Sequence, residues 1–401
     1  MKIEKLKLPD SAIDFLKSQG FEKLYPPQAD CIKSGLLDGK SILVSAPTAS
    51  GKTLIAMLAM LNYLSKNNGK IIYLSPLRAL AAEKFAEFKK LEKISIGKKI
   101  KTSISTGDFE HIEKNLENSN VLILTNEKMD SIIRHGAEWV DEIGLVISDE
   151  VHLIGDESRG PTLEMILTHL KLLDLKPQIV GLSATITNSD EIAKWLDCKL
   201  VKNDWRPVPL SEGVYDGGKV MMSDGEIFEV KPSLRGIPID LGVQCVQQGG
   251  QSLVFAETRV RSKSLATKAA DIISEMLEKK ELTSLEKTSK QILAENEHTE
   301  IVKTLAILVK KGVAFHHAGL NQKCREIVEK EFRKGTIKLL SSTPTLAAGV
   351  NLPARRVVIS NINRYNAKVG ANRPISILEY KQLCGRAGRP QYDDYGESII
   401  V

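Results

Sequence analysis

The sequence APTASGKT occupies residues 46–53 and continues the short apolar run SILVS of residues 41–45. The apolar run predicts a buried strand, and a helical pattern begins near Gly51. Backbone N–H groups in a loop between a strand and a helix converge on one point, where they and the helix dipole bind phosphate. The stretch therefore predicts a nucleotide-binding unit within an α/β fold.

Within this loop, Lys52 is expected to reach the β- and γ-phosphates of a nucleotide, and the Thr53 hydroxyl to bind Mg²⁺. The strict pattern G-x-x-x-x-G-K-[ST] is not met, because Ala46 stands at its first glycine. A GKT sequence after a strand also occurs in ordinary loops. Whether this loop binds a nucleotide therefore has to be judged from the other motifs of the chain. The other loop residues predicted to contact the nucleotide are Thr48, Ala49, Ser50 and Gly51.

Apolar runs and helical patterns alternate along the first half of the chain. Alternation of this kind favours a parallel, doubly wound sheet. Further buried strands are predicted at residues 70–75, 120–124, 145–148 and 178–182, and helices at 53–65 and 78–91. The segment KNDWRPVPL, residues 202–210, carries two prolines and predicts a linker.

A second alternating region follows the linker. Its strand candidates are residues 251–256, 313–316, 337–340, 356–359 and 398–401, preceded by a predicted hairpin at 214–230. Residues 279–299 are strongly charged and predict an exposed helical excursion. With about 150 residues per domain as a guide, 401 residues suit two domains. We therefore predict two similar domains of mostly parallel sheet flanked by helices, residues 1–203 and 204–401.

Composition excludes several classes of protein. Hydrophobic residues make up 42% and charged residues 26%, as in ordinary globular proteins. No window approaches a membrane span, and MKIEKLKLPD at the N-terminus lacks the apolar core of a signal peptide, so we expect a cytoplasmic protein. The five cysteines are widely spaced, which argues against a zinc site or disulfides.

Charge is distributed unevenly along the chain. The net charge is +6, but residues 310–401 hold 16 Lys and Arg against 7 Asp and Glu. A basic C-terminal quarter is compatible with a polyanion-facing surface and equally with a solvated face plus a few phosphate-binding arginines.

Two adjacent carboxylates, Asp149 and Glu150, follow the apolar run LVIS. Acidic groups at the end of a buried strand are costly unless they bind a cation. Asp149 suits Mg²⁺ coordination, and Glu150 is placed to orient and deprotonate an attacking water. An acidic loop without function is the alternative, which the upstream phosphate loop disfavours. His152 beside this pair is expected to link the ATP site to a neighbouring motif.

A third signature, QLCGRAGRP, covers residues 382–390. Gln382, Arg386 and Arg389 recur at i, i+4 and i+7, which predicts one face of a helix. Arginines of this kind can neutralise charge on a transferring phosphoryl group. A solvated basic face is the alternative, but the glycines at 385 and 388 weaken a helix, and close backbone approach explains them better.

Taken together, these signatures resemble those of superfamily 2 helicases. The DEVH sequence at 149–152, with HHAGL and GVNLPARR, is similar to the Ski-like branch, and most similar to archaeal Hjm-type DNA repair helicases, relatives of the helicase domain of DNA polymerase theta. The resemblance covers nearly the whole chain. It implies two tandem RecA-like domains with ATP and Mg²⁺ in the interdomain cleft, and a monomeric motor on single-stranded or forked DNA, moving 3′ to 5′ in repair of stalled replication forks.

The resemblance also implies roles for single residues. Gln28 corresponds to the glutamine that reads the adenine edge, and Ser183-Ala184-Thr185 to the motif that couples hydrolysis to unwinding. Gly349, Asn351 and Gln382 are implied nucleotide contacts. Implied nucleic-acid contacts are Pro76, Arg78, Gly107, Thr125, Lys128, His317, Thr345 and Tyr365. Residues 361–377 correspond to a β-hairpin that wedges duplex strands apart, with an exposed connecting loop as the alternative.

Three other functions compete with this one. An RNA helicase of the same branch shares the catalytic core, and APTASGKT and LSPLRALAAEK favour the DNA members. A catalytically inactive nucleic-acid-binding scaffold would have a damaged Lys52, Glu150 or Arg389, yet all three are intact. A small-molecule kinase leaves the arginines unexplained. Because the family continues into further C-terminal domains, the resemblance also implies that this sequence is a motor fragment.

Overall fold

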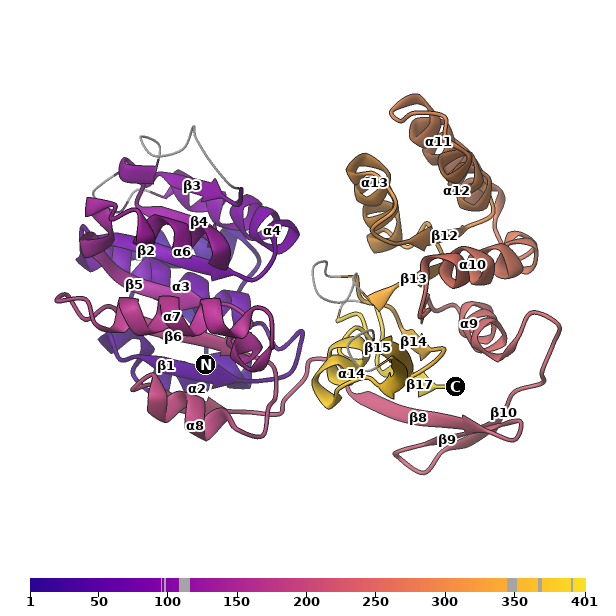
Figure 1. Ribbon diagram of the computed structural model, residues 1–401, viewed down its shortest axis with the longest axis horizontal. Helices are drawn as coiled ribbons and strands as arrows, with labels where there is room; N and C mark the ends of the chain where they lie inside the picture. The colour runs from indigo at the N-terminus through magenta and orange to yellow at the C-terminus, as the bar shows by residue number, and fades with distance from the viewer. Residues whose placement is uncertain (95, 97–98, 108–115, 345–351, 367–369, 391) are drawn as a thin grey trace. The chain divides into compact units, whose positions relative to one another are not determined.

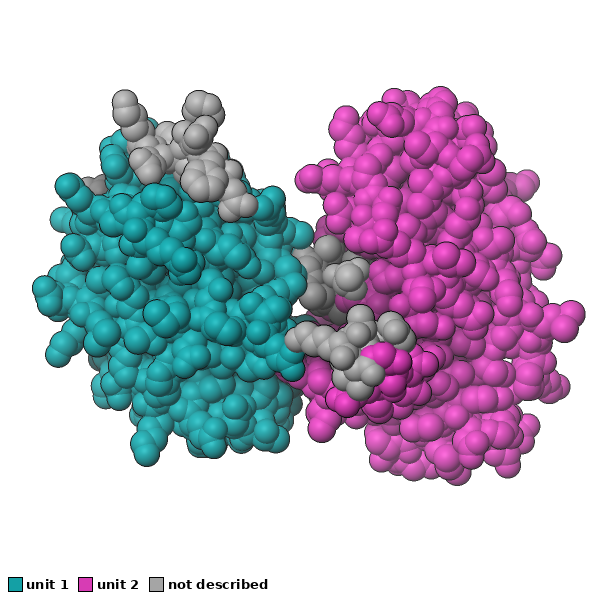
Figure 2. Space-filling model, in the orientation of Figure 1, with its two compact units in different colours: residues 1–206 teal, residues 207–401 magenta. Residues whose placement is uncertain are grey.

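The computed structural model describes the chain except at residues 95, 97–98, 108–115, 345–351, 367–369 and 391. The described residues form two compact units, Met1–Arg206 and Pro207–Val401 (Figure 2). The division between the units falls inside the proline-containing segment that the sequence predicts as a linker.

A seven-stranded sheet in which every neighbouring pair is parallel forms the centre of the first unit (Figure 1). Five of the strands match those predicted. The other two, β3 and β7, are edge strands with partly exposed side chains, and so lack the apolar run of a central strand. In sheet order the strands are β3 (Thr102–Ser105), β4 (Val121–Thr125), β2 (Lys70–Ser75), β5 (Ile143–Ser148), β6 (Gln178–Ser183), β1 (Ile42–Ser45) and β7 (Lys199–Lys202).

Helices cover both faces of this sheet (Figure 1). Alternate strand residues therefore enter two cores: Ile42 and Val44 of β1 belong to one, and Leu43 to the other. The first core takes α1 (Asp10–Ser18), α2 (Pro26–Lys33), α3 (Lys52–Lys66) and α4 (Arg78–Phe88). The second takes α6 (Asn126–Arg134), α7 (Gly160–Lys171) and α8 (Ser189–Trp195). Short 3₁₀ turns are η1 (Ile3–Lys5), η2 (Leu36–Asp38), η3 (Lys89–Lys93), η4 (Glu138–Glu142) and η5 (Val151–Gly155).

The second unit has an eight-stranded mixed sheet (Figure 1). Six strands are parallel, and the predicted hairpin of residues 214–230 is part of an antiparallel extension at one edge. In sheet order the strands are β10 (Ile227–Glu229), β9 (Lys219–Met222), β8 (Leu210–Asp216), β17 (Gly396–Ile400), β14 (Arg356–Ile359), β11 (Ser252–Phe255), β13 (Leu339–Ser342) and β12 (Val313–His316). The predicted fold class, mostly parallel sheets with flanking helices, is confirmed in each unit.

The charged segment 279–299 is less exposed than predicted. It forms α11 (Lys279–Ala294), whose Leu285 and Ile292 are buried, and the Ser289 hydroxyl donates to the Ala306 carbonyl in α12 at 2.7 Å. The buried positions Leu285, Thr288, Ser289 and Ile292 recur at i, i+3, i+4 and i+7, and this one face packs an otherwise charged helix. The helices of this unit are α9 (Ile237–Gln247), α10 (Arg259–Ser274), α11, α12 (Glu300–Lys310), α13 (Gln322–Arg333) and α14 (Ile377–Cys384). Over the described part of both units, no helix is long and apolar enough to cross a bilayer.

The predicted arginine helix is wrong in its extent. Helix α14 ends at Cys384, so Gln382 is helical while Arg386 lies in a turn and Arg389 lies outside any helix or strand. Gly388 has a φ of +86°, and a Cβ atom there would lie 2.6 Å from Val208 Cγ1. The backbone conformation and the tight packing at position 388 both favour glycine, so at this position the predicted close approach fits the structure.

Residues 361–377 include the predicted hairpin. Strands β15 (Asn363–Asn366) and β16 (Ala371–Pro374) pair antiparallel, with Arg364 opposite Arg373, and Gly370 at the turn has a φ of +67°. The hairpin is separate from the eight-stranded sheet. The segment therefore has the form of the hairpin that the resemblance implies, and whether it acts as a wedge or only as an exposed connection stays a prediction.

Candidate nucleotide-binding site

The predicted catalytic residues of the first unit lie at one edge of its sheet. Strands β1, β5 and β6 are neighbours, and being parallel they end at the same edge. The loop of residues 46–51 follows β1, Asp149 and Glu150 follow β5, and Ala184 follows β6. The carboxyl edge of a parallel sheet is where α/β proteins bind ligands.

The loop after β1 has the backbone of a phosphate cradle. Ala49 and Gly51 both have positive φ, 66° and 83°, and Gly51 is the N-cap of α3, so the loop turns its N–H groups towards the start of the helix. Gln28 braces this loop: its Oε1 accepts from the Tyr25 N–H at 2.7 Å and its Nε2 donates to the Gly51 carbonyl at 3.1 Å. Position 51 favours glycine, because its φ of +83° is one that L side chains rarely adopt and a Cβ atom there would lie 2.2 Å from Gln28 Nε2.

Lys52 folds over this loop. Its Nζ donates to the carbonyls of Ala46 and Pro47 at 2.8 and 3.0 Å. Burial lowers the pKa of Lys52, and the carboxylates of Glu150 and Asp149 act in the opposite direction. An anionic phosphate oxygen is a stronger acceptor than a carbonyl, so a nucleotide would compete well for this ammonium group.

Asp149 is buried and held from two sides. Its Oδ2 accepts from the Tyr73 hydroxyl at 2.5 Å and its Oδ1 from the Glu150 N–H at 3.0 Å. Burial raises the pKa of Asp149, with a further rise from the Glu150 charge. A carboxylate of this kind and the Thr53 hydroxyl are hard oxygen ligands, which fit Mg²⁺ brought in with a nucleotide. Within the described ranges there is no group of three or more His, Cys, Asp or Glu residues that could hold a metal ion.

The imidazole ring of His152 lies between Glu150 and Ala184 of the 183–185 motif. The Ala184 N–H donates to His152 Nδ1 at 3.2 Å, so the other nitrogen carries the proton of a neutral ring. That nitrogen, Nε2, lies 3.3 Å from Glu150 Oε2. Burial lowers the pKa of His152 to about 4, which keeps the ring neutral. His152 was predicted to link the ATP site to a neighbouring motif, and the structure places Ala184 of the 183–185 motif in contact with its ring.

Predicted nucleic-acid contacts in the first unit differ in exposure. Arg78 is exposed as the first residue of α4, whereas Pro76 before it is buried. Thr125 is buried and caps α6, because its hydroxyl accepts from the Lys128 N–H at 3.4 Å. Gly107 and the Lys128 side chain are partly exposed. This exposure suits direct contact of Arg78 and Lys128 with a nucleic-acid strand, whereas Thr125 stabilises the start of α6.

In the second unit, Arg389 is held by its own neighbours. Its Nε and one terminal nitrogen donate to the Asp393 carboxylate, both at 2.7 Å, and its other terminal nitrogen donates to Gln251 Oε1. The Gln251 amide nitrogen in turn donates to the carbonyls of Phe332 and Ile337 at 2.8 and 2.6 Å. Asp393, only 4% exposed, was not singled out from the sequence, although its i, i+4 spacing from Arg389 is the available signal.

The remaining predicted nucleic-acid and nucleotide contacts lie in the second unit. His317 is buried, its ring stacked on Phe315 with centroids 5.4 Å apart, and its Nδ1 accepts from the Gly319 N–H at 3.1 Å. This arrangement favours a role for His317 in stabilising the turn over direct contact with a nucleic-acid strand. Tyr365 lies in β15, but its side chain is outside the described atoms. Thr345, Gly349 and Asn351 lie outside the described residues.

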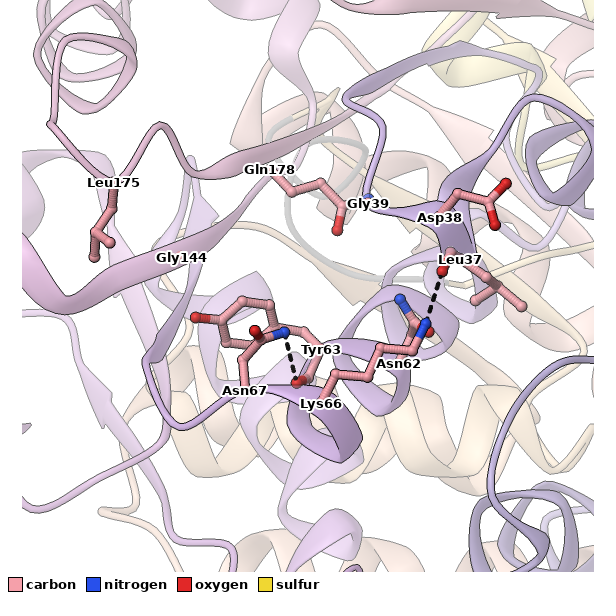
Figure 3. A pocket seen from close by; sticks show the side chains of 10 residues that line it. All are labelled: Leu37, Asp38, Gly39, Asn62, Tyr63, Lys66, Asn67, Gly144, Leu175 and Gln178. Atoms are coloured by element: carbon pink, nitrogen blue, oxygen red, sulfur yellow. Dashed lines mark hydrogen bonds between the residues drawn. The ribbon is translucent and has the colours of Figure 1, made fainter.

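A pocket of about 600 Å³ lies at the opposite edge of the first sheet (Figure 3). It is lined by residues that precede β1, begin β5 and β6, and end α3, including Gly39, Gly144, Gln178 and Asn67. The Lys66 ammonium at its rim donates to the Leu37 carbonyl at 3.0 Å. None of the predicted nucleotide-binding residues lines it, which separates this pocket from the candidate site.

Two family models match the chain. A DEAD/DEAH box helicase model covers residues 25–192, and a helicase conserved C-terminal domain model covers residues 268–391. The first match spans the phosphate loop and the Asp149–Glu150 pair, and the second spans Gln382, Arg386 and Arg389. The chain belongs to the superfamily 2 helicases and, within them, to the Ski-like branch.

Its curated relatives include three archaeal proteins named ATP-dependent DNA helicase Hel308. The protein of Methanocella arvoryzae is 45% identical over 100% of this chain and 54% of its own length. Those of Pyrococcus horikoshii and Caldivirga maquilingensis are each 44% identical over 100% of this chain, and are covered over 54% and 52% of their lengths. The chain thus spans about half the length of the relatives it matches.

Proposed function

We propose that this chain is the motor of an ATP-dependent DNA helicase that translocates 3′ to 5′ along one strand and acts in repair of stalled replication forks. The observation that carries the proposal is the intact set of Lys52, Thr53, Asp149 and Glu150 at one sheet edge, with His152 joining Glu150 to the 183–185 motif. The relatives named DNA helicases support DNA as the substrate.

In this proposal each residue has a separate task. Lys52 and the N–H groups of the loop bind the phosphates, and Thr53 and Asp149 would hold the Mg²⁺ that neutralises phosphate charge. Glu150 orients the attacking water and accepts its proton, while His152 fixes the carboxylate. Arg386 and Arg389 stabilise charge on the transferring phosphoryl group.

The strand is held mainly through its phosphates, so binding should be independent of sequence and sensitive to salt. Arg78 and Lys128 are proposed contacts in the first unit. Outside the described residues, Thr345 remains a proposed contact, with Gly349 and Asn351 proposed for the nucleotide. We propose that the protein acts as a monomer.

ATP hydrolysis should be stimulated more by single-stranded DNA than by RNA of the same sequence. Steady-state ATPase rates with matched strands measure this directly. Preferential stimulation by RNA would favour the RNA helicase of the same branch, and absence of hydrolysis with either strand would favour a binding scaffold.

The hairpin β15–β16 should act in strand separation and not in hydrolysis. Replacing residues 365–372 with Asn-Gly joins Arg364 to Arg373, already opposite one another, through a two-residue turn. The ion pair between Arg364 and Glu379 stays available to hold the base of the hairpin. We expect DNA-stimulated ATPase within about twofold of wild type, the margin of a surface change, and unwinding of a tailed duplex to fall severalfold more.

Measuring both activities on the same preparation separates the outcomes. Equal loss of ATPase and unwinding would mean that the hairpin supports the fold, and unchanged unwinding would remove its proposed role as a wedge.

A further inference from the structure

A lysine ammonium group lies at the place where the proposed function needs magnesium. Lys84 is on α4, and its Nζ donates to Thr53 Oγ1, in the first turn of α3, at 2.7 Å. Thr53 Oγ1 is the oxygen proposed to bind Mg²⁺. Lys84 is 7% exposed, so the contact belongs to the interior and is not a chance surface contact.

Stability by itself gives little reason for this arrangement. The N-terminus of a helix carries partial positive charge, and α3 presents that end to the Lys84 ammonium. The positive charge of Lys84 adds to burial in lowering the pKa of Lys52, and it opposes the rise that burial causes in the pKa of Asp149. A buried cation in this position needs nearby carboxylates to offset its cost.

Those carboxylates come from two sources. Glu87, one turn further along α4, has its Oε2 3.2 Å from Lys84 Nζ, and Glu83 Oε1 is 3.9 Å away. Asp149, the other proposed Mg²⁺ ligand, is within electrostatic range. Lys84 therefore has one set of partners in the nucleotide site and another on its own helix.

Mg²⁺ and the Lys84 ammonium cannot both remain on Thr53 Oγ1 at low cost. A magnesium–oxygen bond of about 2.1 Å and the 2.7 Å hydrogen bond would keep a dication and a monocation less than about 5 Å apart. Glu83 and Glu87 can keep the ammonium after it leaves Thr53.

We propose that Lys84 is a resident counter-cation of the nucleotide site, which holds Thr53 before the nucleotide binds and, when Mg²⁺ arrives, gives up Thr53 while it keeps its contacts with Glu83 and Glu87. This inference rests on the proposed function, because it takes Thr53 and Asp149 as the Mg²⁺ ligands. Mg²⁺ has to displace Lys84, so Lys84 sets how much Mg²⁺ the protein needs in order to bind nucleotide. In the absence of Mg²⁺, Lys84 stays and attracts the phosphates.

The test is equilibrium binding of a fluorescent ADP analogue, titrated with Mg²⁺ and measured again in excess EDTA. In Lys84→Met, which retains length and loses charge, we expect half-saturating Mg²⁺ to fall on the order of tenfold, the effect of one modest charge repulsion. ADP binding in EDTA should weaken severalfold. Lys84→Gln should behave alike, which guards against a folding defect specific to one variant.

Lys70→Met is the matched control. Lys70 is similarly buried, at 5% exposure, but lies at the opposite edge of the sheet, where its Nζ donates to the Glu117 and Ser119 carbonyls. The Lys70→Met protein should need the same Mg²⁺ concentration for half-saturation as wild type. An unchanged or increased Mg²⁺ requirement in both Lys84 variants would overturn the inference. Wild-type protein that binds no ADP with Mg²⁺ would instead overturn the proposed function.

Discussion

The Glu150→Gln variant should hydrolyse ATP at least about 10²-fold more slowly than wild type, the usual contribution of a general base. Glutamine has the length of glutamate, and its Oε1 can still accept from His152 Nε2, 3.3 Å from the carboxylate in the wild-type protein. It cannot accept a proton from water. Steady-state ATPase with saturating single-stranded DNA and equilibrium ADP binding are the two measurements.

ADP binding should remain within a few-fold of wild type in Glu150→Gln, because the phosphate cradle is untouched. Lys52→Ala is the matched comparison: it removes the ammonium that now donates to the Ala46 and Pro47 carbonyls, and should weaken nucleotide binding as well as hydrolysis. Wild-type turnover in Glu150→Gln would remove Glu150 from the catalytic role.

The Arg389→Ala variant should lose about 10³-fold or more in kcat, the range for arginines that stabilise a transferring phosphoryl group. ADP binding should change little, because such an arginine acts on the transition state. The measurement is kcat for DNA-stimulated ATPase. For this role the guanidinium has to exchange Asp393 and Gln251 for phosphate oxygens.

Asp393→Ala separates that role from a structural one. Without the Asp393 carboxylate the Arg389 guanidinium is released, so a catalytic arginine should leave kcat within a few-fold of wild type. If Arg389 only braces the chain through its ion pair with Asp393, the two variants should lower kcat and thermal stability alike. That second result would leave Arg386 as the candidate for the arginine that stabilises the transferring phosphoryl group.

The predicted strands show which features local sequence encodes well. The runs at 70–75 and 178–182 became β2 and β6 because central parallel strands are buried on both faces and need continuous apolar residues. The edge strands β3 and β7 were missed because one or both of their faces are partly exposed. The arginine helix was predicted from the i, i+4 and i+7 spacing, but α14 ends at Cys384, before both arginines.

The sequence by itself determined the fold class and the linker segment, and it predicted the phosphate loop and the acidic pair, because each depends on neighbouring residues or on short spacings. Only the tertiary structure decided the partners of the charged groups. Lys84 meets Thr53 across 31 residues, Tyr73 meets Asp149 across 76, and Arg389 meets Gln251 across 138. These contacts follow from the order of strands in each sheet, which brings together elements that are distant in the chain. A buried charged group is stabilised by the polar groups that this strand order places within hydrogen-bonding distance. No local sequence pattern predicts which groups those are.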